Sequence, residues 1–206
     1  FNLTAVCDTN IKVLQEIKSA NKEILTYSDN LEMVKEHHPD IIVIASPDET
    51  HVKMIIDSLE VSPKIIFVEK PLVRNFAEHQ QLTNSLNNNV TKLVVNFSRR
   101  FNPMYEEIFH DTRVSKIIIK FSGTLIHNGI HFFDLILKRF GEPESINKLT
   151  SDLLLFTYKS NLNVIFINIQ DVNASVEEIE IYLKNERYLI SNNKQIKQKK
   201  IEDPAF

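Results

Sequence analysis

A lysine follows a buried strand at a place suited to chemistry. The apolar run 65–68, Ile-Ile-Phe-Val, is typical of a strand buried on both faces of a parallel sheet. Such a strand delivers the next residues to the carboxyl edge of the sheet, where open α/β folds bind ligands. Lys70 stands there, and Pro71 turns the chain away. Lys70 can donate a hydrogen bond and, when partly desolvated, act as an acid or base near neutral pH. The alternative is a solvated lysine in a loop.

Two histidines four residues apart stand at the start of a predicted helix. If residue 127 is already helical, His127 and His131 share one face. They could bind a metal, but a metal needs a third ligand, and no glutamate of the metalloprotease type lies between them. We therefore expect no metal. A histidine at a helix start that faces a cleft is also suited to donate or accept a proton.

Polar residues also follow two other predicted strands. Asp8 lies just past a strand end, where dinucleotide folds place an acid that accepts hydrogen bonds from ribose hydroxyls. The alternative is an acid favoured by the dipole of the next helix. After the strand at 41–45, Pro47 turns the backbone, and the next helix offers free N–H groups to a phosphate or ribose. His51 falls in the first turn of that helix, where a histidine is more often structural than catalytic.

A pair of arginines follows the fourth predicted strand. Arg99 and Arg100 could bind a phosphate or a carboxylate. The alternative is packing, with Phe101 buried and the arginines bridging the two halves of the chain. The residues alone leave both open.

The elements that position these groups alternate in the first half of the chain. Strands are predicted at 3–6, 41–45, 65–68 and 93–96, with helices at 11–20, 31–36, 50–59 and 76–86. This alternation predicts a parallel, doubly wound sheet with right-handed crossovers. We assign residues 1–112 to this nucleotide-type domain.

The pattern changes in the second half. One helix is predicted at 130–140, with strands at 114–121, 153–158, 164–169, 178–183 and 187–190. Alternating apolar and polar residues indicate antiparallel strands with one covered face. The polar stretch 191–200 is interpreted as a solvated edge or tail. We assign residues 113–206 to an α+β domain with a mainly antiparallel open sheet.

Composition excludes several classes. The chain has 206 residues, of which 43% are hydrophobic, and a formal charge of -3. It therefore has a sizeable core and gives no electrostatic case for nucleic acid or an acidic membrane. No apolar run approaches the roughly 20 residues of a membrane helix. The single cysteine, Cys7, and the lack of a signal-peptide pattern fit a reducing cytoplasm.

Glycine is scarce, and the chain begins at Phe1 inside an apparent strand. Its three glycines all lie after residue 122. A dinucleotide fold normally begins with a strand and a glycine-rich turn. We therefore expect a partial chain whose Rossmann-type sheet is incomplete at the N-terminus.

Together these motifs resemble the glucose–fructose oxidoreductase / inositol dehydrogenase (Gfo/Idh/MocA) family. The resemblance covers essentially the whole chain, and the motifs occur in the family's order. The matching segments are Ala5-Val6-Cys7-Asp8, Ile44-Ala45-Ser46-Pro47 with His51, Glu69-Lys70-Pro71, Arg99-Arg100-Phe101-Asn102-Pro103 and Gly129-Ile130-His131-Phe132-Phe133-Asp134.

The resemblance implies hydride transfer between a nicotinamide cofactor and a hydroxyl or carbonyl carbon of a sugar, nucleotide-sugar or cyclitol. It implies that Lys70 polarises the reacting oxygen and contacts the cofactor, and that His131 is the general acid/base. It also implies that Asp8 holds the adenosine ribose, which favours NAD over NADP. The remaining cofactor contacts that it implies are Ala45, Ser46, Pro47, His51, Glu69 and Arg100.

The chain departs from the family pattern in three places. The glycine-rich turn is absent from its 206 residues, so this chain alone is expected to bind the cofactor poorly. His127 stands where the family often has an Asp, and we include it in the catalytic set. The segments near 121–123 and 150–151 are shorter than usual. These departures favour an alternative, a cofactor-free relative that acts as a binding or scaffold subunit, whereas the retained Lys70 and His131 disfavour it.

The second domain also predicts an assembly. Its helix at 130–140 covers one sheet face, and we expect the other face to carry aromatic residues, drawn from Phe156, Tyr158, Phe166 and Tyr182. A large aromatic patch is unusual on a monomer. We therefore expect a homodimer or homotetramer through this sheet.

Overall fold

The computed structural model describes residues 2–87, 89–103, 105, 114–170, 175–183 and 186–191, and the backbone of 194–200. The chain divides into two compact units, Phe1–Asn96 and Phe97–Phe206. The boundary expected from the sequence, at 112/113, falls on residues outside the described ranges. Each unit is described by itself.

Unit 1 alternates short strands with helices, as the sequence predicts. Its elements are β1 (Ala5–Cys7), α1 (Ile11–Ala20), β2 (Leu25–Tyr27), α2 (Asn30–His37), β3 (Ile41–Ile44), η1 (Asp48–Thr50), α3 (His51–Leu59), β4 (Ile65–Glu69), α4 (Phe76–Leu86) and β5 (Lys92–Asn96). Asn10, Asp29 and Asn75 begin α1, α2 and α4, and each side-chain oxygen accepts a backbone N–H of the first turn. The short strand β2 was not predicted.

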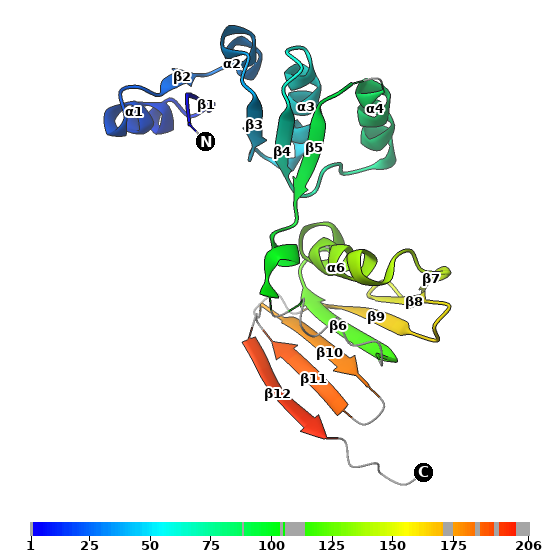
Figure 1. Cartoon of the computed structure of the whole chain (residues 1–206). Coiled ribbons are helices and arrows are strands. Elements are labelled where there is room, and N and C mark those ends of the chain that lie inside the picture. The colour runs from blue at the N-terminus through cyan, green and yellow to red at the C-terminus, as the bar shows by residue number, and fades with distance from the viewer. Residues whose placement is uncertain are drawn as a thin grey trace. The chain divides into compact units, whose positions relative to one another are not determined.

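All strand pairs of unit 1 are parallel, but they form two sheets. One has the order β1-β2 and the other β3-β4-β5 (Figure 1). In the doubly wound order 3-2-1-4-5-6, strands 2 and 4 lie on either side of strand 1 and do not pair with each other. The strands β1 and β3 are likewise unpaired with each other, as strands 2 and 4 of that order are.

The core of unit 1 lies on one face of the β3-β4-β5 sheet. Ile66 and Val68 of the central strand β4 are fully buried, together with Ile55 of α3 and Val34 of α2. The intervening Ile65 and Phe67 are half-buried, so β4 is fully buried on one face and partly buried on the other. An apolar run does not reveal whether both of its faces are equally covered.

Unit 2 is a seven-stranded mixed sheet with one long described helix. Its described elements are η2 (Ser98–Phe101), β6 (Lys116–Ser122), η3 (Leu125–Gly129), α6 (Ile130–Phe140), β7 (Ser145–Lys148), β8 (Leu153–Thr157), β9 (Asn163–Ile169), β10 (Glu177–Tyr182), β11 (Glu186–Ser191) and β12 (Lys194–Lys200). The strand order is β12-β11-β10-β6-β9-β8-β7, and every pair is antiparallel except β6–β9. The polar stretch at 191–200 supplies the edge strand β12, whereas β7 was not predicted.

Helix α6 packs onto one face of this sheet (Figure 1). Aromatic side chains of the strands lie in the core cluster beneath it. Phe133 of α6 stacks on Phe166 with ring centroids 4.3 Å apart and contacts Phe156 at 5.2 Å. Tyr158 belongs to the same buried cluster. The expectation that these three strand aromatics lie on the opposite face was therefore wrong, because alternation separates two faces without saying which one the helix covers.

The opposite face carries Tyr182, as one of the four candidates predicted, together with aliphatic and charged residues. Strand registers align Leu155 with Ile165, Ile165 with Ile118, and Ile118 with Glu180. Leu153 pairs with Ile167 in the neighbouring row. Strands β6, β8 and β9 therefore contribute aliphatic residues to this face, which we call the aliphatic face. Its residues are Ile118, Leu153, Leu155, Ile165 and Ile167, all half-buried.

A buried carboxylate lies beside the aliphatic face. Glu180 is only 4% exposed and accepts hydrogen bonds from Lys120 Nζ at 2.6 Å, Tyr182 Oη at 2.6 Å and Arg187 Nη2 at 2.5 Å. Burial alone would raise the pKa of Glu180, but the hydrogen bonds and positive charges of these partners lower it to about 2. The cluster ties β6, β10 and β11 together.

We predict that Glu180→Gln destabilises unit 2 in a pH-dependent way. A carboxylate whose pKa is depressed in the folded state stabilises above its unfolded pKa of about 4.3, and this contribution is lost as the pH falls toward 2. At pH 7 the variant should lose roughly 1–3 kcal/mol of unfolding free energy in urea titrations.

The difference between the wild-type and Gln proteins should shrink between about pH 4.5 and pH 2. The matched control is Glu178→Gln, since Glu178 lies on the same strand but is more exposed, with its carboxylate 3.5 Å from Lys120. It should cost less than about 1 kcal/mol. A pH-independent loss in Glu180→Gln would contradict the role assigned to its charge.

Candidate functional site

The carboxyl ends of β3, β4 and β5 form one edge of unit 1. Lys70 follows β4 at this edge and is half-buried. The residue before it is anchored sideways, because Asn96 Nδ2 of β5 donates to Glu69 Oε1 at 2.6 Å, and the two residues are register partners. The backbone that leads into Lys70 is therefore fixed by its neighbouring strand.

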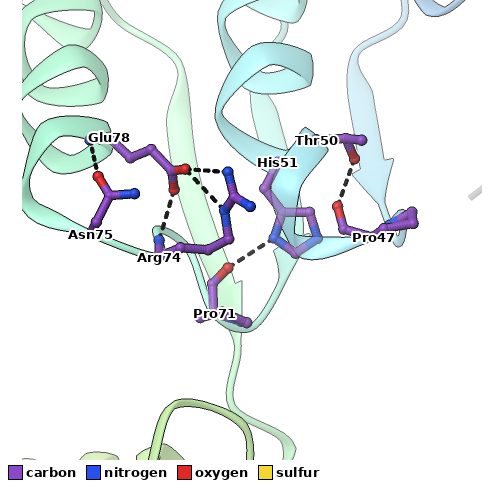
Figure 2. A network of polar contacts seen from close by, with 7 residues as sticks. All are labelled: Pro47, Thr50, His51, Pro71, Arg74, Asn75 and Glu78. Atoms are coloured by element: carbon purple, nitrogen blue, oxygen red, sulfur yellow. Dashed lines mark hydrogen bonds and ion pairs between the residues drawn. The ribbon is translucent and has the colours of Figure 1, made fainter.

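The turn after β3 is closed by its own hydrogen bonds. The backbone oxygen of Pro47 accepts from Thr50 N at 2.9 Å and from Thr50 Oγ1 at 2.7 Å (Figure 2). Ser46 Oγ lies 2.6 Å from the same hydroxyl. Ala45 and Pro47 are exposed and Ser46 is half-buried, so the turn presents a small, preformed surface at the sheet edge.

His51 lies behind this surface rather than on it. The residue is fully buried, and its two ring nitrogens lie at hydrogen-bond distance from two backbone oxygens: Nδ1 is 2.8 Å from Pro71 O, and Nε2 is 2.9 Å from Ser46 O. Figure 2 shows the ring between the two turns. This geometry favours a positioning role for His51 over direct contact with a cofactor.

Asp8 lies at the end of the other sheet. Its Oδ1 accepts the backbone N–H of Asn10 at 2.7 Å, while Asn10 itself caps α1. The carboxylate is thus held in an Asx turn and is not the helix cap. The surroundings are acidic: burial raises the pKa of Cys7, and so do the negative charges of Asp29, Asp8 and Glu32.

In unit 2, the two candidate histidines lie at and just before the start of α6. His131 lies in the first turn of α6, is half-buried, and meets the ring of Phe97 edge-on at 6.2 Å. His127 is exposed on η3, a single π-helical turn whose start is capped by Thr124. Such turns are rare and recur at functional sites; the sequence analysis did not predict this one.

Gly129 sets the path of the chain between the two histidines. A Cβ at this position would come within 2.9 Å of Phe121 Cζ and of Leu125 Cδ1. Leu125 is partly exposed and can shift, but Phe121 is 1% exposed in the core. The close approach of η3 to β6 therefore requires glycine here.

Arg100 and Arg99 are engaged within unit 2. Arg100 makes a two-pronged ion pair with Asp134 of α6, and this carboxylate raises the pKa of the guanidinium. Arg99 pairs with Glu177 of β10 and lies 4.4 Å from the ring centre of Phe132. These contacts fasten the segment after β5 to α6 and β10. Assignment of Arg100 to the cofactor stays a prediction.

The packing alternative for the arginines also needs one correction. It expected a buried Phe101, but that side chain is 78% exposed. The ion pairs of Arg99 and Arg100 attach the segment after β5 to the rest of unit 2 without Phe101, since both acidic partners lie in unit 2.

Among the described residues, no group of three or more His, Cys, Asp or Glu side chains could hold a metal ion. No helix in the same ranges is long and apolar enough to cross a membrane.

Residues 1–97 match the model of the oxidoreductase family with an NAD-binding Rossmann fold, GFO_IDH_MocA. Residues 1–97 therefore belong to the Gfo/Idh/MocA family. Among curated proteins of Bacillus subtilis (strain 168), it is 24% identical over 170 residues to the putative oxidoreductase YteT, covering 69% of this chain and 38% of the relative. It is 34% identical over 79 residues to scyllo-inositol 2-dehydrogenase (NAD(+)), covering 38% of this chain and 23% of the relative.

The fold extends the likeness beyond the matched half. The WlbA dehydrogenase from Bordetella pertussis, solved in complex with NADH and UDP-GlcNAcA, superposes with a TM-score of 0.80 at 15% identity, covering 98% of this chain and 70% of that one. At this identity the likeness shows the fold alone. The chain matches less than half the length of either curated relative.

We predict that Gly129→Ala strains the start of α6. The added methyl group meets a buried ring that cannot move freely, and overpacking of this kind costs roughly 1–3 kcal/mol. Urea denaturation should show this loss. The control His127→Ala, on the exposed side of the same turn, should change stability by less than about 0.5 kcal/mol. Equal stabilities of the two variants would contradict the packing requirement at Gly129.

Proposed function

We propose that this protein is an NAD-dependent oxidoreductase acting on a hydroxyl or carbonyl carbon of a sugar, nucleotide-sugar or cyclitol. The observation that carries the proposal is the anchored position of Lys70 at the carboxyl end of β4, in a chain of an NAD-binding oxidoreductase family. The names of its relatives, an inositol dehydrogenase and a dehydrogenase solved with NADH and UDP-GlcNAcA, support this substrate class. They do not favour the cofactor-free alternative.

The ribose end of a dinucleotide fits the described residues. Asp8 holds its carboxylate in a fixed turn at a strand end, and among the described residues Oδ2 has no recorded hydrogen bond. This oxygen is suited to accept from ribose hydroxyls. Asp29 and Glu32 add negative charge that disfavours a 2′-phosphate, which supports NAD over NADP. Residues 1–122 include no glycine, so we assign no pyrophosphate contact of the glycine-turn type to them.

The reacting end is assigned to Lys70, with Ala45, Ser46 and Pro47 at the same edge. NAD supplies the hydride acceptor or donor when bound. We assign Lys70 to the hydrogen bond that polarises the reacting oxygen, and His131 of unit 2 to proton transfer. His127 replaces the family's usual carboxylate near His131, and we assign it to the same proton-transfer set.

We predict that the protein binds NADH more tightly than NADPH, and that Asp8→Asn narrows the difference by about tenfold, because it removes a negative charge next to the 2′-position. Fluorescence titration with each nucleotide measures both affinities. Asp40→Asn is the matched control, since Asp40 is exposed, precedes β3, and pairs with Lys64. Tighter binding of NADPH by the unmodified protein would contradict the assignment of Asp8.

We predict that Lys70→Met abolishes most turnover while leaving stability nearly unchanged. Loss of a positioned donor should reduce kcat roughly 100- to 10,000-fold, and a half-exposed lysine contributes little to folding. Lys64→Met is the control, because Lys64 precedes the same strand at its other end and is exposed. Reduction of NAD with scyllo-inositol or UDP-GlcNAcA as trial substrates is the assay. Equal activity of both variants would remove Lys70 from the mechanism.

We further propose a homodimer or homotetramer through the aliphatic face of unit 2. Five half-buried aliphatic side chains on adjacent strands form a continuous apolar area, and such areas commonly mark contact surfaces. Ile165→Lys, at the centre of the face, should dissociate the assembly. The control Ile146→Lys lies on strand β7 at the sheet edge, 58% exposed, and should not. A sedimentation experiment at micromolar concentration that finds only monomer in the unmodified protein would overturn the proposal.

A further inference from the structure

His51 connects two turns that are far apart in sequence. Its Nδ1 lies 2.8 Å from Pro71 O, in the turn after β4, and its Nε2 lies 2.9 Å from Ser46 O, in the turn after β3. The residue is fully buried at the start of α3, and Pro71 is buried as well. One side chain therefore touches the backbone of both strand ends.

Both partners of the ring are of the same kind. A carbonyl oxygen only accepts hydrogen bonds, so the ring donates through a nitrogen that carries a proton. Both ring nitrogens lie within hydrogen-bond distance of a carbonyl oxygen in a buried site. Loss of a hydrogen bond in such a site costs more than loss of an exposed one.

Each turn is also closed on its outer side. Thr50 donates twice to Pro47 O in the first turn. Beyond the second turn, Glu78 of α4 accepts from the backbone and from the guanidinium of Arg74 (Figure 2). These contacts are each local to one turn. In contrast, the His51 contacts reach across from one turn to the other.

We infer that His51 is a positioning residue whose buried ring lies against both backbone oxygens and fixes the spacing between the Ser46 turn and the Lys70-Pro71 turn. The backbone of Lys70 is held on one side by the Glu69–Asn96 contact and on the other by His51 through Pro71. The consequence for cofactor affinity rests on the proposed function, because that function places both turns against NAD. The contacts by which His51 braces the two turns do not depend on that function.

Two amide substitutions separate the two contacts. An asparagine side chain places its amide nitrogen one bond beyond Cγ, as in Nδ1 of histidine. A glutamine side chain can place its amide nitrogen where Nε2 lies. His51→Asn should therefore keep the contact with Pro71 and lose that with Ser46, and His51→Gln should do the reverse.

Hydrogen exchange followed by mass spectrometry reads each turn separately. In His51→Asn we expect exchange roughly two- to tenfold faster in residues 46–50 and little change in 69–74. In His51→Gln we expect the opposite pattern. His79→Asn, on the exposed side of α4, is the control and should change neither turn. If both variants loosen the same turn, or neither turn, the bracing role is overturned.

Two further readings complete the test. Nitrogen-15 spectra of the unmodified protein should show a slowly exchanging ring N–H of His51 held by a carbonyl oxygen, and a freely exchanging ring N–H would overturn the bracing role even if a variant fails to fold. NADH titration should give weaker binding in both variants than in the control. If the unmodified protein binds no NADH but each variant loosens the turn expected for it, the proposed function is contradicted and the bracing role of His51 is supported.

Discussion

Burial of β4 between β3 and β5 is the constraint on which the arrangement of unit 1 depends. Ile66 and Val68 are fully buried against Ile55 of α3, and this packing fixes where the strand ends. Burial of such side chains stabilises by roughly 1.5–3 kcal/mol each. Because parallel strands end at the same edge, the turns that carry Ser46 and Lys70 are brought together by the core alone. Polar contacts then adjust their backbone positions.

Ion pairs hold the candidate site segments of unit 2, whereas contacts with backbone carbonyl oxygens hold those of unit 1. Arg100 and Arg99 attach the segment after β5 to α6 and β10 through carboxylates. Arg100 bonds Asp134, three residues beyond His131 on α6, so the ion pair restrains the helix that carries the candidate acid/base. The two units thus hold their candidate catalytic residues by different means, one through backbone hydrogen bonds and one through ion pairs.

The long elements could be predicted from the sequence because several local signals agree there. Three helices, at 11–20, 76–86 and 130–140, have the predicted bounds, where periodic apolar residues coincide with capping Asn or Gly. The strands β2 (Leu-Thr-Tyr) and β7 (Ser-Ile-Asn-Lys) were missed because each is short and has no apolar run. The placement of Phe156 and Phe166 failed since alternation does not identify the covered face, and the π-helical turn of η3 depends on the tertiary contact at Gly129.

We propose that the strand ends of unit 1 that carry Asp8, Ser46 and Lys70 contact NAD. Mapping of amide chemical shifts in the labelled protein during NADH titration tests this contact. We expect saturable shifts at the ends of β1, β3 and β4, and smaller ones at their opposite ends, near Asp40 and Lys64. Shifts confined to η2 around Arg99 and Arg100, or the absence of saturable shifts at all three strand ends, would contradict it.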